Sequence, residues 1–325
     1  MNSETDRRSI ESVGVYTPRY RISSKTITDA GGTFEARGVT RKTVPAGDED
    51  TVTMAVAAAE RALSDGSVGP ADVVELHLAT TTPPQESFDI GATVIELLGL
   101  PASTAVTVRT QSTNAGTRAL DAAFDSDGPA LVIAADAPAA APDDPIEHAA
   151  GAGAVAFLLT AEGPVDRVDA ASFAEEYPGT RFRERGSDEV VSYGATAYER
   201  RAFIRPIVGA VNALDEAPSA LAVTAPDGSL PSRVSRALEH ETETYHVADD
   251  LGDLGAASAL FGLLAAWEND EPTVTVVGHG SGAGATALSL DGSLSVTLSR
   301  RTEEIGYATY LRKRGHTLGA DGGDS

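Results

Sequence analysis

The stretch ALVIAAD, from Ala130 to Asp136, is an unbroken run of apolar residues with an acidic end. It is shorter than most helices, and a continuous apolar run of this length is typical of a strand buried on both faces. A second stretch of this kind, AGAVAFLLT at 152–160, comes after a loop. Strands covered on both faces need helices on either side of the sheet, so these stretches predict a layered α/β fold.

The sequence on the amino-terminal side of ALVIAAD alternates in the same way. Apolar, β-rich runs predict strands at 10–16, 73–80 and 105–109. Amphipathic stretches between them predict helices at 50–63, 89–98 and 115–124, the first starting near Asp48 or Asp50. This alternation is typical of α/β folds.

The same alternation returns on the carboxyl-terminal side. We expect helices at 203–214, 231–239 and 254–267, and strands at 220–224, 274–277, 286–290 and 294–298. The repeated pattern indicates a weak internal duplication. We therefore predict two halves, 8–162 and 163–314, followed by a disordered tail at 315–325.

The composition excludes several classes of protein. Asp and Glu number 48 against 25 Lys and Arg, which gives a formal charge of −23 and a pI near 4.5. This charge has the wrong sign for nucleic-acid binding by phosphate neutralisation. No apolar window is long enough to span a bilayer, and the first residues show no secretory signal, so we expect neither a nucleic-acid partner nor a membrane and place the chain in the cytoplasm.

Lysine is rare in this acidic chain, where it stands only at Lys25, Lys42 and Lys313. The acidic residues are dispersed rather than gathered in a tail. In concentrated salt, screening weakens the mutual repulsion of such charges, and the charge keeps a protein in solution. We expect a protein from a high-salt cytoplasm. The chain contains no cysteine, which removes disulfides, thiolate metal sites and cysteine nucleophiles.

A glycine run at 278–284, GHGSGAG, resembles a phosphate-binding loop at first sight. Such a loop needs a strand before it and a helix after it. The segment after this run is β-like, so a hairpin is the better interpretation, with glycines that let the backbone approach a neighbouring strand or a ligand. No two histidines lie at metal-ligand spacing, and we predict no metal site. His279, inside the run, is the histidine that we expect nearest to a functional site.

Several stretches together resemble the archaeal 3-hydroxy-3-methylglutaryl-CoA synthase branch of the thiolase superfamily. They cover nearly the whole chain in order, and it is their combination that is specific. The stretches are GVYTPRYRI (14–22), GVTRKTVPAGDEDT (38–51), ALVIAAD (130–136), AAGAGAVAFLLT (149–160), APDGSLP (225–231), LGDLGAASALFGLLAA (251–266), GSGAGATALSL (280–290) and YATYLRKRG (307–315). The resemblance implies a thiolase-like five-layer αβαβα fold made of two duplicated halves. It also implies an active site between the halves and a homodimer, with a strand-rich face near 105–109 buried between the copies.

The chemistry of that family implies three working groups. A cysteine at a helix N-terminus takes the acetyl group from acetyl-CoA, a histidine orients the second acyl-CoA, and a glutamate moves the proton. Carried over by motif, the cysteine position is Thr113, in TNAGT at 113–117. The histidine position is Thr224, just before APDG, and the glutamate position is Thr81, in ATTTPP at 79–84.

Threonine cannot replace any of these groups in its role. Its hydroxyl stays protonated at neutral pH and needs an adjacent base to react. We find no histidine, lysine or carboxylate placed in these motifs to act as that base, and Ser112 next to Thr113 has the same lack. The glycine motifs meanwhile persist. We therefore expect a catalytically degenerate, synthase-like subunit of acyl-CoA or isoprenoid metabolism that retains an acyl-CoA site.

Two other functions stay open. One is an active acyltransferase, of hydroxymethylglutaryl-CoA synthase or ketoacyl synthase type, that works without cysteine. The other is a purely structural partner subunit that binds no ligand. The resemblance implies further partners, since archaeal relatives assemble with a thiolase and a small zinc-ribbon OB-fold protein.

Coenzyme A or an acyl-CoA is the one ligand that the sequence suggests. The glycine run supplies backbone at Gly280, Ser281, Gly282 and Gly284. An arginine-rich stretch includes Arg181, Arg183, Arg185, Arg200, Arg201 and Arg205. Arg201 and Arg205 are candidates for the CoA phosphates, because phosphates take charge-assisted hydrogen bonds from guanidinium groups. The alternative is an ordinary salt-bridged surface on an acidic protein.

Overall fold

A computed structural model describes residues 7–179, 181–192, 200–298 and 300–316. The first half of the chain forms a five-stranded sheet in the order β1-β7-β6-β4-β5. Its strands are β1 (Ser9–Tyr16), β4 (Glu75–Ala79), β5 (Ala105–Arg109), β6 (Ala130–Asp136) and β7 (Gly153–Thr160). β4 runs parallel to β5 and β6, whereas β7 is antiparallel to β6 and β1. As predicted, ALVIAAD is a strand, and every residue of β6 is buried.

The second half repeats this sheet strand for strand. Its order is β8-β14-β13-β11-β12, and its strands are β8 (Asp166–Ala174), β11 (Ala220–Val223), β12 (Glu243–Tyr245), β13 (Thr273–Gly280) and β14 (Gly284–Asp291). β11 is parallel to β12 and β13, and β14 is antiparallel to β13 and β8. Matching the strands in chain order gives the connectivity of the first sheet. The duplication predicted from the sequence is confirmed as the organisation of the fold.

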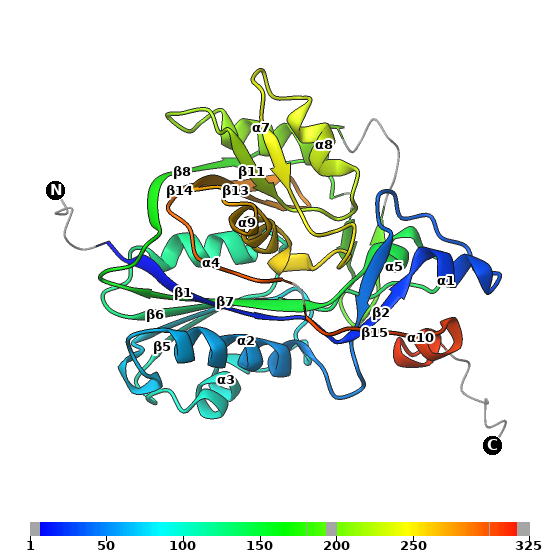
Figure 1. Ribbon diagram of the computed structural model, residues 1–325, viewed down its shortest axis with the longest axis horizontal. Coiled ribbons are helices and arrows are strands. Elements are labelled where there is room, and N and C mark those ends of the chain that lie inside the picture. Colours follow the sequence, from blue (N-terminus) through cyan, green and yellow to red (C-terminus); the bar gives the residue numbers. More distant parts are fainter. Residues whose placement is uncertain (1–6, 180, 193–199, 299, 317–325) are drawn as a thin grey trace.

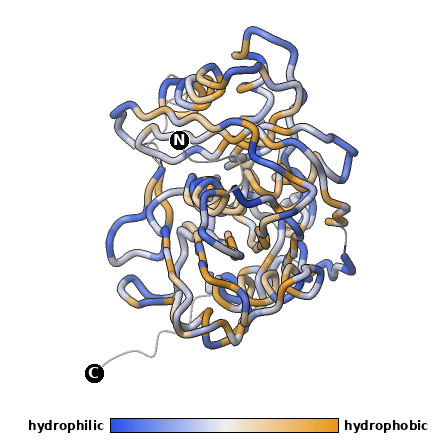
Figure 2. The backbone as a smooth tube through the Cα atoms, turned by 90° about the vertical axis from the view of Figure 1, so that its left-hand side faces the viewer, coloured by the Kyte–Doolittle hydropathy of each residue, from blue (hydrophilic) through white to orange (hydrophobic). Residues whose placement is uncertain are grey.

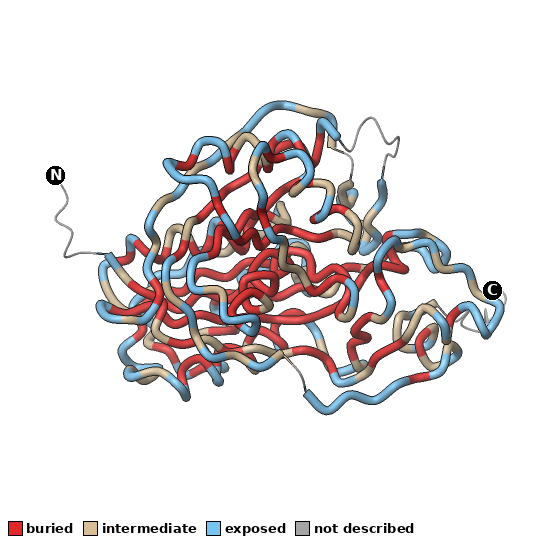
Figure 3. The backbone as a smooth tube through the Cα atoms, turned by 45° about the horizontal axis from the view of Figure 1, so that its top comes forward, coloured by how far each residue is buried: buried red, intermediate tan, exposed pale blue. Residues whose placement is uncertain are grey.

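Helices complete a five-layer arrangement (Figure 1). The outer layers contain α2 (Thr51–Asp65) and α3 (Ile90–Leu98) against the first sheet, and α7 (Arg205–Val211) and α8 (Leu230–Ser235) against the second. Between the two sheets lie α4 (Ala115–Ala123) and α9 (Ser258–Glu268). Nearly all of α9 is buried, as expected for a helix enclosed by two sheets. Figure 3 shows the buried backbone concentrated in these inner layers.

A small lobe lies beside the two sheets. It holds the three-stranded sheet β15-β2-β3, with β2 (Tyr20–Ser23), β3 (Arg41–Val44) and β15 (Glu303–Glu304), together with α1 (Ser24–Asp29), α5 (Pro145–Ala149) and α10 (Tyr307–Lys313). The remaining elements are the hairpin β9 (Arg181–Arg183) and β10 (Val190–Ser192), the π-helical turn η2 (Arg200–Ile204), and the 3-10 turns η1 (Pro70–Asp72) and η3 (Gly255–Ala257). Figure 2 shows hydrophilic residues, in blue, mostly along the outer loops.

Local sequence signals account for where the helices begin and end. Asp50 caps α2, with its side chain accepting a hydrogen bond from Thr53 N, as the prediction of a start near this residue required. Asp89 caps α3 in the same way, and Gly99 ends that helix in the left-handed conformation that glycine adopts without strain. In α4, Gly116 lies against the Ala256 carbonyl so closely that a Cβ would collide with it. This glycine therefore lets the two halves meet.

Three expectations from the sequence need correction. The strand predicted at 294–298 pairs with no other strand in the described part of the chain. Leu294, Val296 and Leu298 instead pack on the core between the sheets. The alternating apolar pattern therefore arises because one side of this segment is buried, and not because the segment is hydrogen-bonded into a sheet. The helix predicted at 203–214 begins as η2 and continues as α7. The disordered tail predicted at 315–325 is wrong for His316, which contacts buried Glu147; residues 317–325 lie outside the described residues.

Candidate functional site

The three threonines singled out by sequence lie next to the ends of three elements that face the middle of the molecule. Thr81 follows β4, Thr224 follows β11, and Thr113 lies just before Asn114, the N-cap of α4. The carboxyl ends of parallel strands are where α/β folds bind their ligands. Thr224 is buried, whereas Thr81 and Thr113 are partly exposed.

The backbone of His279 brings two of these threonines together. Thr113 Oγ1 donates a hydrogen bond of 2.6 Å to the His279 carbonyl oxygen. The His279 amide in turn donates to Thr224 Oγ1, at 3.0 Å. The structure therefore joins a residue of the first half to one of the second half through β13. Thr81 is not joined to this pair by a hydrogen bond within the described residues, and its hydroxyl bonds elsewhere.

The imidazole of His279 points away from Thr113 and toward η2. Its Nε2 lies 2.7 Å from the Ala202 carbonyl oxygen, and its ring meets that of Phe203 edge to face, with centroids 4.7 Å apart. Burial lowers the pKa of His279 to about 4. The side chain is thus a neutral, structural group. The partner of the Thr113 hydroxyl is an amide carbonyl, which is too weak a base to activate it.

A carboxylate that the sequence analysis missed lies behind Thr81. Asp136, at the end of β6, is completely buried. Its Oδ2 accepts a hydrogen bond of 2.7 Å from Thr81 Oγ1, and its Oδ1 accepts one of 2.9 Å from the Thr81 amide. The expectation that no carboxylate is placed at these motifs is therefore wrong for Thr81. The sequence did point to this carboxylate, since the stretch ALVIAAD ends in an acidic residue at the carboxyl end of a predicted buried strand.

Three further donors complete the surroundings of Asp136. Thr80 Oγ1 and Thr82 Oγ1 donate to Oδ1 at 3.1 and 2.6 Å, and the Ala256 amide donates to Oδ2 at 2.7 Å. Burial raises the pKa of Asp136, and these hydrogen bonds oppose that rise. Gly255 has a φ of 54° and lies against the carboxylate so closely that a Cβ would collide with it. Asp136 therefore ties the loop after β4 to η3 of the second half.

The glycine run forms a hairpin, as predicted, with β13 pairing with β14 through Gly280 and Gly284. Gly280 lies against Ser112 Oγ, where a Cβ would collide, and Ser281 Oγ accepts a hydrogen bond of 3.0 Å from the Arg181 amide. Gly282 occupies the tip, with a φ of 98°. This hairpin therefore lies next to the start of α4, and its glycines allow that close approach.

The arginine-rich stretch divides into two groups. In β9, Arg181 forms an ion pair of 2.7 Å with buried Asp253, and Arg183 Nη2 donates a hydrogen bond of 3.0 Å to the Thr81 carbonyl oxygen. Arg185 is exposed and pairs with Glu86. β9 therefore reaches both halves of the molecule near Thr81.

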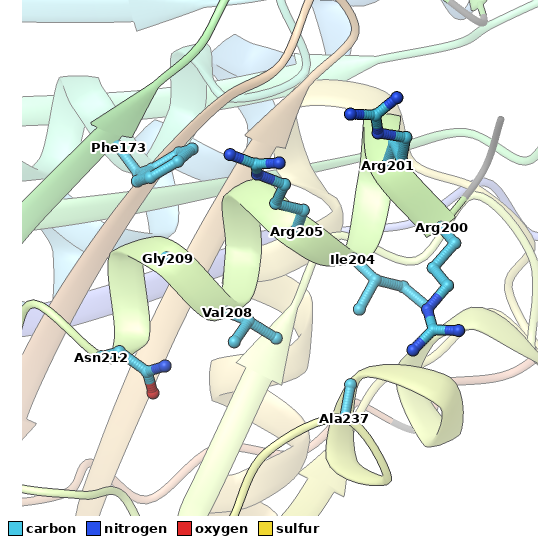
Figure 4. Close-up of a pocket in the computed structure, with 9 residues that line it drawn as sticks. All are labelled: Phe173, Arg200, Arg201, Ile204, Arg205, Val208, Gly209, Asn212 and Ala237. Atoms are coloured by element: carbon cyan, nitrogen blue, oxygen red, sulfur yellow. The ribbon is translucent and has the colours of Figure 1, made fainter.

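The other three arginines line a surface hollow of about 440 Å³ between β8, η2, α7 and the segment after α8. Figure 4 shows the guanidinium groups of Arg201 and Arg205 on one side of α7, with Arg200 on the other side near Ala237. Arg205 pairs with Glu175 at 2.8 Å, and Arg201 stacks on Tyr177, with 5.7 Å between the guanidinium carbon and the ring centroid. The turn η2 therefore contacts two places: Arg200 and Arg201 line the hollow, and the Ala202 carbonyl oxygen lies against the His279 side chain.

Comparisons with known proteins decide the fold. Solved structures of HMG-CoA synthase complexed with CoA and of MvaS in complex with 3-hydroxy-3-methylglutaryl coenzyme A superpose with TM-scores of 0.78 and 0.76. Each covers 94% of this chain, and 90% and 91% of the respective solved chain, at 18% sequence identity. The 3-oxoacyl-[acyl-carrier-protein] synthase III of Aquifex aeolicus superposes with a TM-score of 0.74 over 87% of this chain and 99% of that chain, at 17% identity. The fold is thiolase-like.

Sequence relatives agree with this thiolase-like fold. The hydroxymethylglutaryl-CoA synthase of Methanopyrus kandleri is 28% identical over 93% of this chain and 90% of the relative. That of Archaeoglobus fulgidus is 28% identical over 94% of this chain and 98% of the relative. No protein-family model matches the chain. The chain is therefore similar to hydroxymethylglutaryl-CoA synthases over most of its length, as its motifs indicated.

Neither a metal site nor a membrane span is found in the described part of the thiolase-like chain. The described residues contain no group of three or more His, Cys, Asp or Glu side chains arranged to hold a metal ion. Among the same residues, no helix is long and apolar enough to cross a bilayer.

Proposed function

We propose that this chain is a non-catalytic, acyl-CoA-binding subunit of acyl-CoA or isoprenoid metabolism, which does not perform the condensation of its relatives. The observation that carries the proposal is the environment of Thr113. The chain has no cysteine to form a thiolate, and the Thr113 hydroxyl donates to a backbone carbonyl instead of to a base. The residues at the expected cysteine, histidine and glutamate positions are all threonine.

The solved neighbours support coenzyme A as the ligand. Two of them are described as complexes with CoA or with 3-hydroxy-3-methylglutaryl coenzyme A. In this chain, the arginine-lined hollow beside η2 offers guanidinium groups for phosphates, and η2 also contacts His279. We propose that the acyl end of a bound CoA ester lies near the hairpin at Gly280–Gly284 and the start of α4, which approach each other at Gly280 and Ser112. We place the phosphates at Arg201 and Arg205, and the acyl group near Thr81 and Thr113.

Isothermal titration of the full chain with coenzyme A in molar KCl tests this proposal. We expect one CoA per chain, and at least a tenfold weaker Kd in the Arg201→Gln, Arg205→Gln double variant, because each charge-assisted phosphate contact contributes about 1.5–3 kcal/mol. Arg19→Gln, an exposed arginine that pairs with Glu303, is the matched control and should leave the Kd unchanged. No heat of binding in the unmodified chain would refute the proposal.

We also infer that the chain pairs with a second copy through β5. In the described part of the chain this strand is the last of the first sheet, so one of its edges pairs with no other strand, and Val106 on it is exposed. In an antiparallel pair centred on Thr107, Arg109 of one copy lies opposite Ala105 of the other. Glu75 is the registered neighbour of Ala105. The small Ala105 therefore leaves Arg109 room to reach Glu75 of the other copy.

A further inference from the structure

Three consecutive threonine hydroxyls donate to Asp136, but they differ in what their oxygens accept. Thr80 Oγ1 accepts a hydrogen bond from the Thr82 amide at 3.0 Å, and Thr80 is fully buried. Thr82 Oγ1 accepts one from the Ala137 amide at 3.0 Å. Among the described residues, none donates a hydrogen bond to Thr81 Oγ1, and Thr81 is partly exposed. Within this part of the chain, Thr81 is thus the one of the three whose lone pairs are free.

The other two candidate hydroxyls lack this arrangement. Among the described residues, Thr113 Oγ1 donates only to a carbonyl oxygen, and Thr224 Oγ1 is buried and accepts from the His279 amide. A hydroxyl acts as a nucleophile when a base holds its proton and its own oxygen can reach an electrophile. Thr81 meets both conditions, because Asp136 Oδ2 lies 2.7 Å from its oxygen.

We propose that Thr81 is an acyl acceptor, which takes the acyl group of a bound acyl-CoA as an oxyester, with Asp136 as the base. The proposal rests on the proposed function, because the acyl group must arrive on CoA. It goes beyond that function by assigning a covalent step to the site. It also moves the reactive hydroxyl from the helix start, where the relatives' chemistry would place it, to the end of β4.

The step balances without any further reactant. Thr81 Oγ1 attacks the thioester carbonyl carbon while its proton passes to Asp136 Oδ2, and a C–O bond forms. The C–S bond then breaks, CoA leaves as the thiolate, and it takes the proton back from Asp136. The products are the Thr81 ester, free CoA and an ionised Asp136. Arg183 donates a hydrogen bond to the Thr81 carbonyl oxygen and so holds a positive charge beside this residue.

The buried position of Asp136 makes it a better base than an exposed carboxylate. Burial raises the pKa of Asp136, so its ionised form attracts a proton more strongly than usual. We therefore expect the acylation rate to increase with pH until Asp136 is fully ionised, at a pH above the ordinary range for an aspartate.

Intact mass spectrometry of the full chain, incubated with acetyl-CoA in molar KCl, tests the proposal. We expect a single acetyl adduct, located by peptide mapping on Thr81. Thr81→Val should abolish the adduct, and Thr81→Ser should keep it because the hydroxyl remains. Thr28→Val, at an exposed threonine of α1 away from the site, should leave the adduct unchanged. Asp136→Asn should slow acylation about a hundredfold or more if its fold is retained by circular dichroism. The Thr81→Ser variant keeps the test informative if Asp136→Asn does not fold.

Other results would overturn the assignment. An adduct on Thr113 or Ser112, or an adduct that persists in Thr81→Val, would show that Thr81 is not the acceptor. If acetyl-CoA binds by calorimetry but no adduct forms, the acyl acceptor is refuted and the proposed function stands. If neither binding nor adduct is seen, both are refuted.

Discussion

At the scale of single residues, Asp136 holds together parts of both halves. Its carboxylate accepts hydrogen bonds from three threonine hydroxyls and from the amides of Thr81 and Ala256. These five donors surround one fully buried group. An asparagine would present an amide N–H₂ to some of these donors and leave them unpaired.

We predict that Asp136→Asn lowers the free energy of unfolding by about 2–4 kcal/mol, the range for disrupting a buried, hydrogen-bonded carboxylate. Chemical denaturation followed by circular dichroism measures the loss. Asp125→Asn is the control, since Asp125 is exposed and pairs with Arg167, and it should cost less than about 1 kcal/mol. Equal losses in both variants would contradict the role given to Asp136.

The threonine positions were found by motif, because each lies in a short pattern with a fixed glycine or proline. Asp136 was missed because its contacts are long-range. Thr81 is 55 residues away from it in sequence, and Ala256 is 120 residues away. No local pattern reports such contacts. The direction of the His279 side chain was also outside the reach of sequence reasoning, since Ala202 and Phe203 meet it from a distant segment.

At the scale of elements, α10 is fixed to the body of the molecule by a buried ionic cluster. Glu147 in α5 accepts hydrogen bonds from Tyr310 and Arg314, at 2.6 and 2.7 Å, and lies 3.6 Å from Lys42 of β3. Lys42 also donates to the Tyr310 hydroxyl at 3.0 Å. Burial lowers the pKa of Lys42 from 10.5 to about 7, whereas Arg314 and Lys42 hold the pKa of Glu147 well below its usual value.

This cluster predicts a pH dependence of stability. Between about pH 7 and pH 9, unfolded Lys42 keeps its proton while the folded form loses it, so the unfolded state binds more protons. Stability should therefore increase with pH across this interval. Denaturation curves at both pH values should show the increase in the unmodified chain and a smaller one in Lys42→Met. An equal increase in the variant would exclude Lys42 as its source.

The principal strands and helices were predictable, because each has a clear apolar period or a cap such as Asp50. The error at 294–298 shows the limit of that approach. A strand paired within a sheet and an extended segment that lies on a core show the same alternation of apolar residues. Only the presence of a hydrogen-bonded neighbouring strand distinguishes them, and the sequence does not show that neighbour. The small lobe was not predictable as a unit, because its strands come from residues 20–44 and 303–304.

At the scale of the whole molecule, β5 is an edge strand of the first sheet in the described part of the chain, and a second copy is the partner that we propose for it. An exposed edge with apolar side chains tends to pair with another strand. We predict that Arg109→Glu weakens the dimer, because the new carboxylate would lie near Glu75 of the other copy. Adding Glu75→Arg in the same chain should restore pairing, because the charges are then exchanged.

Sedimentation velocity, in the lowest KCl concentration at which the chain stays folded, measures this effect, since salt screens the ion pair. A monomeric unmodified chain would contradict the proposal. So would a dimer that Arg109→Glu leaves equally stable.

The net charge of −23 predicts that stability depends on salt. Repulsion between dispersed carboxylates destabilises the compact state, and high ionic strength screens it. The free energy of unfolding should increase with KCl concentration from about 0.1 M into the molar range. Urea denaturation at several KCl concentrations measures this dependence, and stability independent of salt would refute the expectation of a high-salt protein.

Our central claim is that a hydroxymethylglutaryl-CoA synthase-like fold here binds acyl-CoA without performing the condensation. The most direct test is to incubate the purified chain with acetyl-CoA and acetoacetyl-CoA in molar KCl and to quantify 3-hydroxy-3-methylglutaryl-CoA by mass spectrometry, with CoA binding measured on the same sample. We predict binding and no such product, because the chain has no thiolate and no imidazole at the reacting positions. Accumulation of the product over repeated turnovers would contradict the claim.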